Sequence, residues 1–348
     1  MNLLPVTGES LERGAEIIKN GGLVAFPTET VYGLGADAFN PQALAKIFDV
    51  KKRPHFDPLI IHIASPRAME DAADFSLISN ETRRKLFLLT DNLWPGPLSV
   101  VLPKNKKIPG IVTAGLQTVA IRLPSNETAL KLISLSGTVI AAPSANPFGS
   151  LSPTRAEHVR DGLGDKIDLI LDGGACQIGI ESTVLDLTSE KIKILRPGGT
   201  PKEEIEKLIG KVESENGNRE SDSDDQAFSS PGQLKSHYAP KTPLVLFNRE
   251  EIINQPDSAR CAGRDRTALL FFDGSTRDEW QKTDKPLKIA IIKVLSENGD
   301  PLEAASRLFE ILHEIDNSNI SQIIAQLAPQ QGLGEAINDR LMRGSVCK

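Results

Sequence analysis

Short apolar runs alternate with helical patterns over the first 210 residues. The runs are rich in Val, Ile and Leu and are separated by Gly, Pro or charged positions, which is typical of β-strands. They span residues 23–26, 59–63, 98–102, 119–123, 139–142, 168–171, 183–187 and 192–196. The intervening stretches predict helices near 8–20, 41–50, 66–73, 80–93, 126–136 and 154–163, with Pro41 and Thr154 as helix-start signals. This alternation predicts a mixed, twisted α/β sheet covered by helices.

The last third of the chain repeats this alternation on a smaller scale. Its predicted strands are 244–247, 268–272, 288–292 and 323–327, and its predicted helices are about 300–315 and 334–343. We expect a second, smaller α/β unit with an open, Rossmann-like sheet.

An acidic segment separates the two regions. Residues 211–225 hold two basic and six acidic residues. In contrast, residues 1–210 hold 23 basic and 24 acidic residues, and residues 226–348 hold 15 basic and 16 acidic residues. A stretch with so few apolar residues cannot bury enough surface to order itself, so it reads as a linker. The predicted organisation is a domain over 1–210, a linker over 211–240 and a domain over 241–348. Because both domains are nearly neutral, any polyanion site must be a local basic cluster.

Composition excludes several classes of protein. No apolar run approaches the roughly 18 residues of a membrane helix, and the first residues lack the basic and apolar regions of a secretory signal. Cys176, Cys261 and Cys347 are too scattered for a disulfide framework or a zinc site. The five histidines include no pair at metal-ligand spacing. These features favour a reduced, cytoplasmic enzyme or binding protein.

Common nucleotide and hydrolase motifs are also missing. The chain has neither GxxxxGK[ST] nor GxSxG, and Gly33 with Gly35 lacks the third glycine of a dinucleotide fingerprint. Any nucleotide would therefore be held without a P-loop.

Polar segments at strand ends are the candidates for chemistry. Residues 27–35, PTETVYGLG, offer hydroxyls for a small polar ligand and glycines for close backbone approach, although a capped turn opening a helix explains them equally well. In KKRP, Lys51 and Arg53 suit either the negative end of a helix dipole or a phosphate clamp.

Further polar residues follow or interrupt the apolar runs. His62 in LIIHI is more typical of a hydrogen-bonded structural residue than of a catalyst. Arg122 needs an anion, either a ligand carboxylate or an internal acid. Ser144 and Asn146 suit ligand contacts or a capped turn. Together these strand ends predict an α/β ligand crevice.

Taken in order, these segments closely resemble the YrdC-like family of threonylcarbamoyl-AMP synthases. The matching motifs are PTETVYGLGADA, KKRPHFDPLIIHI, WPGPLSVVL, TVAIRLP, APSANPFGSLSPT and ESTVLDL, and the resemblance covers essentially all of residues 10–210. SPGQLKSHYAP (230–240) and GLGEAINDRLMR (332–343) resemble signatures of the long, two-domain form. The resemblance implies synthesis of L-threonylcarbamoyl-AMP and pyrophosphate from L-threonine, bicarbonate or CO2, and ATP, with Mg²⁺ accompanying ATP. A separate transferase would then modify the tRNA adenosine beside the anticodon, so this enzyme need not hold tRNA itself.

The resemblance also implies residue roles. Lys51 and Arg53 would be catalytic, with no metal ligand from the protein. ATP would contact Arg53, Asp57, Thr118, Ser144, Ser152, Arg196 and Tyr238. Threonine would contact Thr30, His62, Arg122, Ser182 and the backbone of Ala142. Segment 211–240 would act as a lid that carries Tyr238 to the nucleotide.

Two positions depart from the family pattern. Lys52 stands where a small residue is common, and Asp57 stands where Asn is frequent. An ionised Asp57 would repel a triphosphate unless it binds Mg²⁺ or pairs with Lys52.

Two alternatives remain open. An RNA-binding protein of YrdC-like fold without synthase activity would need more basic charge than either domain carries. An accessory domain of a hydrogenase-maturation carbamoyltransferase would belong to a much larger chain with zinc-finger-like cysteines, which this sequence lacks.

Overall fold

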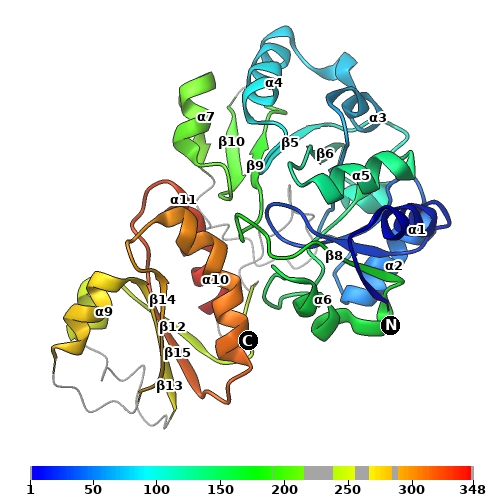
Figure 1. The fold of residues 1–348 in the computed structure, drawn as a ribbon. Helices are drawn as coiled ribbons and strands as arrows, with labels where there is room; N and C mark the ends of the chain where they lie inside the picture. Colours follow the sequence, from blue (N-terminus) through cyan, green and yellow to red (C-terminus); the bar gives the residue numbers. More distant parts are fainter. Residues whose placement is uncertain (1, 190, 215–237, 255–265, 284–288, 346–348) are drawn as a thin grey trace. The chain divides into compact units, whose positions relative to one another are not determined.

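The structure is a computed structural model, and it describes the chain except residues 1, 190, 215–237, 255–265, 284–288 and 346–348 (Figure 1). The chain divides into two compact units. The first contains Met1–Phe148, Pro153–Gln177 and Glu181–Gln233, and the second contains Gly149–Ser152, Ile178–Ile180 and Leu234–Lys348. Two short loops that interrupt the sequence of the first unit therefore belong to the second unit.

A mixed eleven-stranded sheet forms the centre of the first unit. Its strands are β1 (Leu3–Pro5), β2 (Val24–Phe26), β3 (Gly33–Asp37), β4 (Ile60–His62), β5 (Leu98–Pro103), β6 (Thr118–Arg122), β7 (Ile140–Ala141), β8 (Leu169–Asp172), β9 (Thr183–Asp186), β10 (Lys193–Arg196) and β11 (Glu213–Ser214). Their order is β1-β8-β2-β3-β7-β4-β6-β5-β9-β10-β11. The pairs β1/β8, β8/β2, β4/β6, β5/β9 and β10/β11 are parallel, and the others are antiparallel.

Helices pack on this sheet through two apolar clusters. They are α1 (Gly8–Lys19), α2 (Pro41–Lys51), α3 (Met69–Ala72), α4 (Asn80–Leu93), α5 (Glu127–Ser136), α6 (Ala156–Leu163) and α7 (Lys202–Ile209), with 3-10 turns at Pro66–Ala68, Phe75–Leu77, Gly110–Thr113 and Gly164–Lys166. On β2, Val24 and Phe26 join the cluster of α1 and α5, whereas Ala25 joins the larger cluster of α2, α4 and α6. This alternation follows from the two-residue period of a strand.

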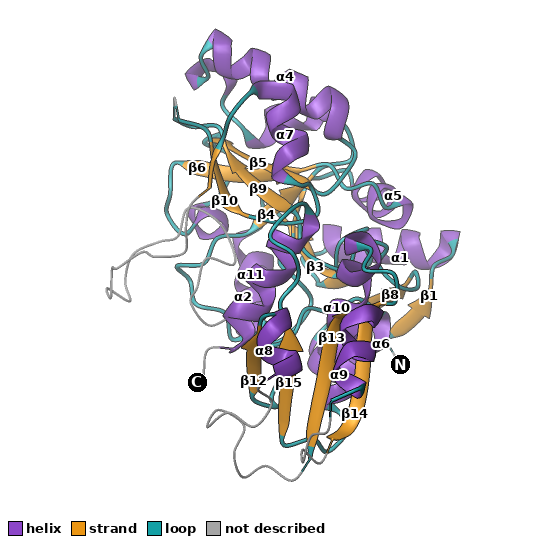
Figure 2. Ribbon diagram, turned by 90° about the vertical axis from the view of Figure 1, so that its left-hand side faces the viewer, coloured by secondary structure: helices purple, strands orange, loops and turns teal. Residues whose placement is uncertain are grey.

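The second unit is a four-stranded parallel sheet with helices. Its strands, β12 (Leu244–Phe247), β13 (Thr267–Asp273), β14 (Ile289–Ser296) and β15 (Gln322–Gln326), have the order β12-β15-β13-β14 (Figure 2). Its helices are α8 (Arg249–Asn254), α9 (Gly274–Gln281), α10 (Pro301–Asp316) and α11 (Leu333–Ser345). Helix α8 packs with α9, and α10 packs with α11.

The predicted fold class is confirmed. Every predicted strand and helix has a counterpart whose ends agree within about two residues, except that β14 extends four residues beyond the predicted 288–292. Sequence patterns missed β1, β3, β11 and the helices α7, α8 and α9. The glycine-rich segment after β2 opens no helix. It continues into β3, where a Cβ at Gly35 would lie 2.7 Å from the Phe26 ring. Thr154 also fails as a helix cap, because α6 starts at Ala156 after Arg155 and has no side-chain cap.

The predicted linker and lid lie mostly outside the described residues. Residues 215–237 are not described, and they include most of SPGQLKSHYAP. At the start of the predicted linker, Glu213–Ser214 forms β11 and extends the first sheet. Among the described helices, none has the length and apolar character needed to span a membrane.

Candidate active site

Polar side chains line one face of the central sheet in the first unit. His62 on β4 lies opposite Arg122 on β6, and Arg122 lies opposite Ser99 on β5. Strand alternation puts these three side chains on the face that carries the small apolar cluster of Ile60, Val101, Ala120, Val184 and Leu195. Three neighbouring strands therefore present one buried polar row.

Arg122 is the centre of this row, and the residue is 3% exposed. It donates to the Thr30 hydroxyl at 2.9 Å and to the Gly96 carbonyl at 3.3 Å, and its Nη2 lies 2.7 Å from Oε1 of Glu29. The internal acid that the sequence left open as the partner of Arg122 is therefore Glu29.

The carboxylate of Glu29 lacks hydrogen-bond donors among the described residues. Its side chain is buried, and within the described residues neither carboxylate oxygen accepts an aligned hydrogen bond; the contact with Arg122 is an ion pair only. A buried charged group normally has such bonds, so this carboxylate retains the capacity to accept hydrogen bonds from a ligand.

His62 is held as a neutral ring. Burial, reinforced by the nearby Arg122 charge, lowers the pKa of His62 to about 3. Its Nδ1 lies 3.1 Å from the Ile60 carbonyl oxygen, and its ring meets Phe26 edge-to-face. In this environment the imidazole can orient a ligand through Nε2 as a neutral group.

Ser182 links the residues predicted for threonine and for ATP. Its hydroxyl lies 2.8 Å from the Ser99 hydroxyl, while Arg196 donates to its carbonyl at 2.9 Å and to its hydroxyl at 3.2 Å. The backbone approaches closely here, since a Cβ at Gly198 would lie 2.4 Å from backbone atoms of residues 181–183. Only glycine fits that position.

Lys51 is buried at the end of α2 and points to the loop after β7. Its ammonium donates to the Ser144 carbonyl at 2.6 Å and to the Asn146 carbonyl, with the Asn146 side-chain oxygen at 3.4 Å. Burial, together with the Arg53 charge, holds the pKa of Lys51 well below its usual value. Three acceptors occupy its three N–H bonds, so Lys51 holds the 144–146 loop in place.

Arg53 and Asp57 form a buried ion pair at 2.9 Å. Arg53 also donates to the backbone carbonyls of Asp57 and Pro58 at 3.1 and 2.8 Å. The cation that offsets Asp57 is thus Arg53, four residues earlier in the same loop, and not Lys52, which is exposed in a left-handed conformation at the end of α2.

The remaining predicted residues lie in varied surroundings. Ala142 donates its N–H to the Ile60 carbonyl at 3.0 Å, beside His62. Thr118 begins β6, four residues before Arg122, about 13 Å along the strand. Ser152 and Tyr238 belong to the second unit. There the Ser152 carbonyl lies 3.1 Å from His313 Nε2, and the buried Tyr238 ring faces the Arg340 guanidinium at 5.0 Å.

Sequence reasoning missed two residues of this site. Glu29 stands between Thr28 and Thr30 in a segment interpreted through its hydroxyls and glycines alone. Ser99 is the polar residue inside the apolar run LSVVL, and this interruption of the pattern was the available signal. Among the described residues, no group of three His, Cys, Asp or Glu side chains is arranged to hold a metal ion.

Comparisons with known proteins place this geometry in a family. The profile of the Sua5, YciO and YrdC proteins, described as "Telomere recombination", matches residues 16–198. A second profile, "Threonylcarbamoyl-AMP synthase, C-terminal domain", matches residues 200–345.

Individual relatives match along nearly the whole chain. The threonylcarbamoyl-AMP synthase of Pyrococcus abyssi is 39% identical over 95% of this chain and 92% of its own length. The threonylcarbamoyl-AMP synthase of Bacillus subtilis is 38% identical over 98% of this chain and 94% of its own length. The crystal structure of P. abyssi Sua5 complexed with L-threonine has a TM-score of 0.86 at 37% identity, covering 99% of this chain and 98% of that chain. The resemblance seen in the motifs is confirmed: the chain belongs to the threonylcarbamoyl-AMP synthase family, in its two-domain Sua5 form.

Proposed function

We propose that this protein synthesises L-threonylcarbamoyl-AMP and pyrophosphate from L-threonine, bicarbonate or CO2, and ATP. The observation that carries the proposal is the buried Arg122–Glu29 pair at 2.7 Å, flanked by Thr30, neutral His62 and Ser99. A guanidinium beside a carboxylate is complementary to the two charged ends of a free amino acid. The relative of known structure that matches over its full length has L-threonine bound.

The proposed threonine subsite follows from this pairing. Arg122 binds the α-carboxylate, and the unsatisfied Glu29 oxygens accept hydrogen bonds from the α-ammonium group. Thr30, the Ser182 hydroxyl, His62 Nε2 and the Ala142 backbone supply the neutral contacts. Because His62 stays uncharged, it adds no repulsion to the ammonium end.

The ATP contacts proposed from the family pattern adjoin this subsite through Arg196, which donates to the Ser182 carbonyl and hydroxyl. Arg53 and Asp57 form a preassembled pair, so the net charge that they offer to the triphosphate is small. Lys51 shapes the loop that carries Ser144. Thr118, Ser152 and Tyr238 complete the proposed ATP set.

Magnesium enters this proposal as part of the ATP substrate. The described residues hold no cluster of three metal-ligating side chains, and the Asp57 carboxylate contacts Arg53. Such a donor set fits an ion that is carried mainly by phosphate oxygens and water, as Mg²⁺ commonly is.

The reaction needs little covalent chemistry from the protein. The α-ammonium group first gives up a proton to solvent, and the resulting amine nitrogen bonds to the carbon of CO2 and gives up a second proton, which leaves an N-carboxylate. An oxygen of that carboxylate then bonds to the α-phosphorus of ATP as the bond to pyrophosphate breaks. Positioning of the substrates by preorganised groups, Arg122, Arg53 and Arg196 among them, provides most of the rate enhancement. The product would pass to a separate tRNA threonylcarbamoyl transferase in the cytoplasm, without a need for this chain to hold tRNA.

The test is turnover with ATP, L-threonine, bicarbonate and Mg²⁺, following pyrophosphate and the mass of the adduct together. We expect both signals to require threonine and bicarbonate. Arg122→Ala should abolish threonine-dependent release of pyrophosphate. Arg84→Ala, at an exposed position on α4, should release pyrophosphate at the wild-type rate. Folded, ATP-binding protein with neither signal would refute the proposal and favour the RNA-binding alternative.

A further inference from the structure

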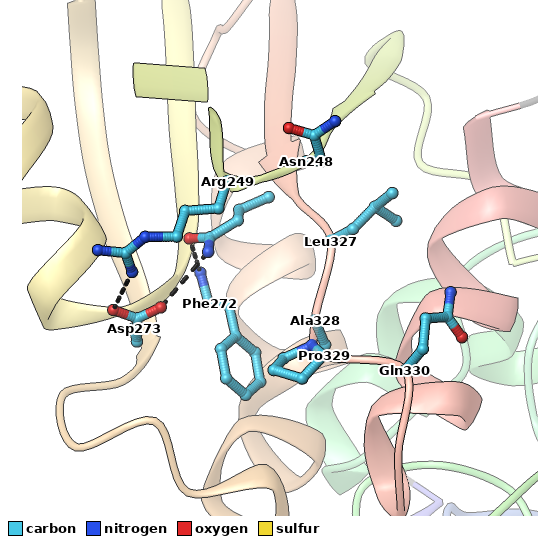
Figure 3. Close-up of a pocket in the computed structure, with 9 residues that line it drawn as sticks. Asn248, Arg249, Phe272, Asp273, Leu327, Ala328, Pro329 and Gln330 are labelled. Atoms are coloured by element: carbon cyan, nitrogen blue, oxygen red, sulfur yellow. Dashed lines mark hydrogen bonds and ion pairs between the residues drawn. The ribbon is translucent and has the colours of Figure 1, made fainter. Parts of the chain in front are cut away.

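The second unit contains a cavity that the synthase reaction does not use. It measures about 390 Å³ and lies at the carboxyl ends of three parallel strands (Figure 3). Asn248 and Arg249 follow β12, Phe272 and Asp273 end β13, Gln326 ends β15, and residues 327–330 follow it. This volume falls within the range of small-molecule sites.

The topology of the sheet accounts for the position of the cavity. The chain leaves β12 and β13 into α8 and α9, which pack together, and leaves β15 towards α11, which packs with α10 (Figure 2). Right-handed crossovers put these two helix pairs on opposite faces. Since β15 lies between β12 and β13, the connection that leaves β15 and the connections that leave its two neighbours run to opposite faces of the sheet. Open parallel sheets bind ligands at such points of divergence.

The walls of the cavity are held by specific hydrogen bonds. The buried Gln326 side chain accepts from the Phe272 N–H at 2.9 Å and donates to the Thr276 hydroxyl at 3.2 Å, which ties β15 to β13 and α9. Asn338 on α11 is fully buried, and its amide bonds both the N–H and the carbonyl of Ala328 at 2.8 Å.

Glycine allows the same helix to approach this wall. A Cβ at Gly334 would lie 1.9 Å from the Pro329 carbonyl oxygen. Gly334 and Asn338 both belong to the motif GLGEAINDRLMR, and neither is among the residues assigned to the synthase site. The motif therefore preorganises the loop that lines the cavity.

The lining selects the class of ligand. Phe272, Leu327, Ala328 and Pro329 form apolar walls, whereas the amide nitrogen of Asn248 and the amide of exposed Gln330 form no hydrogen bond with the described part of the chain. Apolar walls with free amide groups at the edge fit a planar ring that carries hydrogen-bonding groups. Asn and Gln side chains pair with the N6 and N7 edge of adenine in particular.

Charge argues against a phosphate on that ring. Arg249 is the cation of the lining, and it is already engaged by Glu279 at 2.8 Å and by the Thr276 hydroxyl at 2.6 Å, with Asp273 at 3.7 Å. Two carboxylates beside one guanidinium leave no positive excess for an anion. We propose that this cavity, bounded by the ends of β12, β13 and β15, binds an uncharged purine nucleoside of the adenosine type.

The test is equilibrium dialysis of labelled adenosine against the full chain, with saturating ATP and no threonine so that the synthase site is filled. We expect one adenosine per chain, and at least tenfold weaker binding of AMP. Ala328→Trp fills the cavity and should abolish adenosine binding, and Phe272→Ala should weaken it about tenfold by removing a stacking ring. Leu302→Trp, at an exposed position of α10, is the matched control and should bind normally.

Gln330→Ala covers the case in which a buried substitution prevents folding. This exposed change should weaken adenosine binding three- to tenfold while pyrophosphate release stays at the wild-type rate. Absence of adenosine binding up to 1 mM would overturn the proposal. So would binding that Ala328→Trp leaves intact, or AMP binding as tightly as adenosine.

Discussion

Replacing Glu29 by Gln tests whether this carboxylate reads the α-ammonium group of threonine. The substitution keeps the shape of the side chain and removes its charge. At 2.7 Å from Arg122, the pair attracts with about 6 kcal/mol at an effective dielectric constant of 20. Desolvation offsets much of this, and losing one partner of a buried pair typically costs about 3–5 kcal/mol of stability.

The effect of Glu29→Gln on threonine binding is smaller than its effect on stability, and it differs between ligands with and without an ammonium group. A hydrogen bond to a charged group contributes about 1.5–3 kcal/mol, so Glu29→Gln should weaken L-threonine binding by about 10- to 150-fold. 3-Hydroxybutyrate keeps the carboxylate and hydroxyl of threonine but lacks the ammonium. Its binding should stay equal or become tighter, because the carboxylate that repels it is gone.

Calorimetric titration of both ligands into wild type and variant separates this role from a structural one. Glu127→Gln, at an exposed position of α5, is the matched control and should match wild type. Equal losses for both ligands would mean that Glu29 acts only by holding Arg122. A threonine affinity within threefold of wild type would refute the ammonium contact altogether.

Four further outcomes follow from the site. Lys51→Met removes the donor to the 144–146 loop and should lower kcat/KM for ATP at least 100-fold with little change in threonine affinity; equal losses for both substrates in kinetic and binding assays would contradict a role specific to that loop. Because burial lowers the folded-state pKa of His62 to about 3, the unfolded chain binds more protons between pH 3 and 6.5, and wild type should lose up to about 1.4 kcal/mol per pH unit below 6.5. His62→Gln should remove this component, so the free energies of unfolding at pH 7 and 5, obtained from urea titrations, should draw closer by about 2 kcal/mol in the variant, and an unchanged gap would count against the buried neutral ring. Gly198→Ala pushes a methyl into backbone 2.4 Å away and should raise KM for threonine and lower the melting temperature; wild-type values for both would show that the segment adapts. Deleting residues 215–348 should abolish synthesis while the first unit keeps its circular dichroism spectrum, and an undiminished rate from the folded fragment would overturn the need for the second unit.

Strand and helix periodicity recovered most of the fold, because most elements bury a clear apolar face. The exceptions have physical reasons. β3 reads as a turn, since Gly33 and Gly35 are there to let the Phe26 ring pack against the sheet. Helix α9, with the sequence GSTRDEWQ, offers few apolar positions to reveal a period and is capped by Asp273.

The sequence could name candidate site residues, but it could not predict the contacts between their side chains. The resemblance named His62, Arg122 and Ser182, yet the row across β4, β6 and β5 depends on strand register, which tertiary packing sets. Glu29 was hidden because a charged residue in a polar segment looks solvated until the fold buries it. For Lys51 the sequence offered either a helix-end cation or a phosphate clamp, and it could not show that the donors reach backbone and side-chain oxygens 93 and 95 residues further along the chain.

The assignment of Gly149–Ser152 and Ile178–Ile180 to the second unit has a consequence for biosynthesis. These loops leave the ribosome long before the segments on which they pack, which include Ala239, bonded to Gly149, and His313, beside Ser152. The sheet of the first unit can assemble early, but both loops must wait for the end of translation. A growing chain would thus gain its scaffold well before Ser152 is fixed, and synthase activity would switch on only with the finished polypeptide.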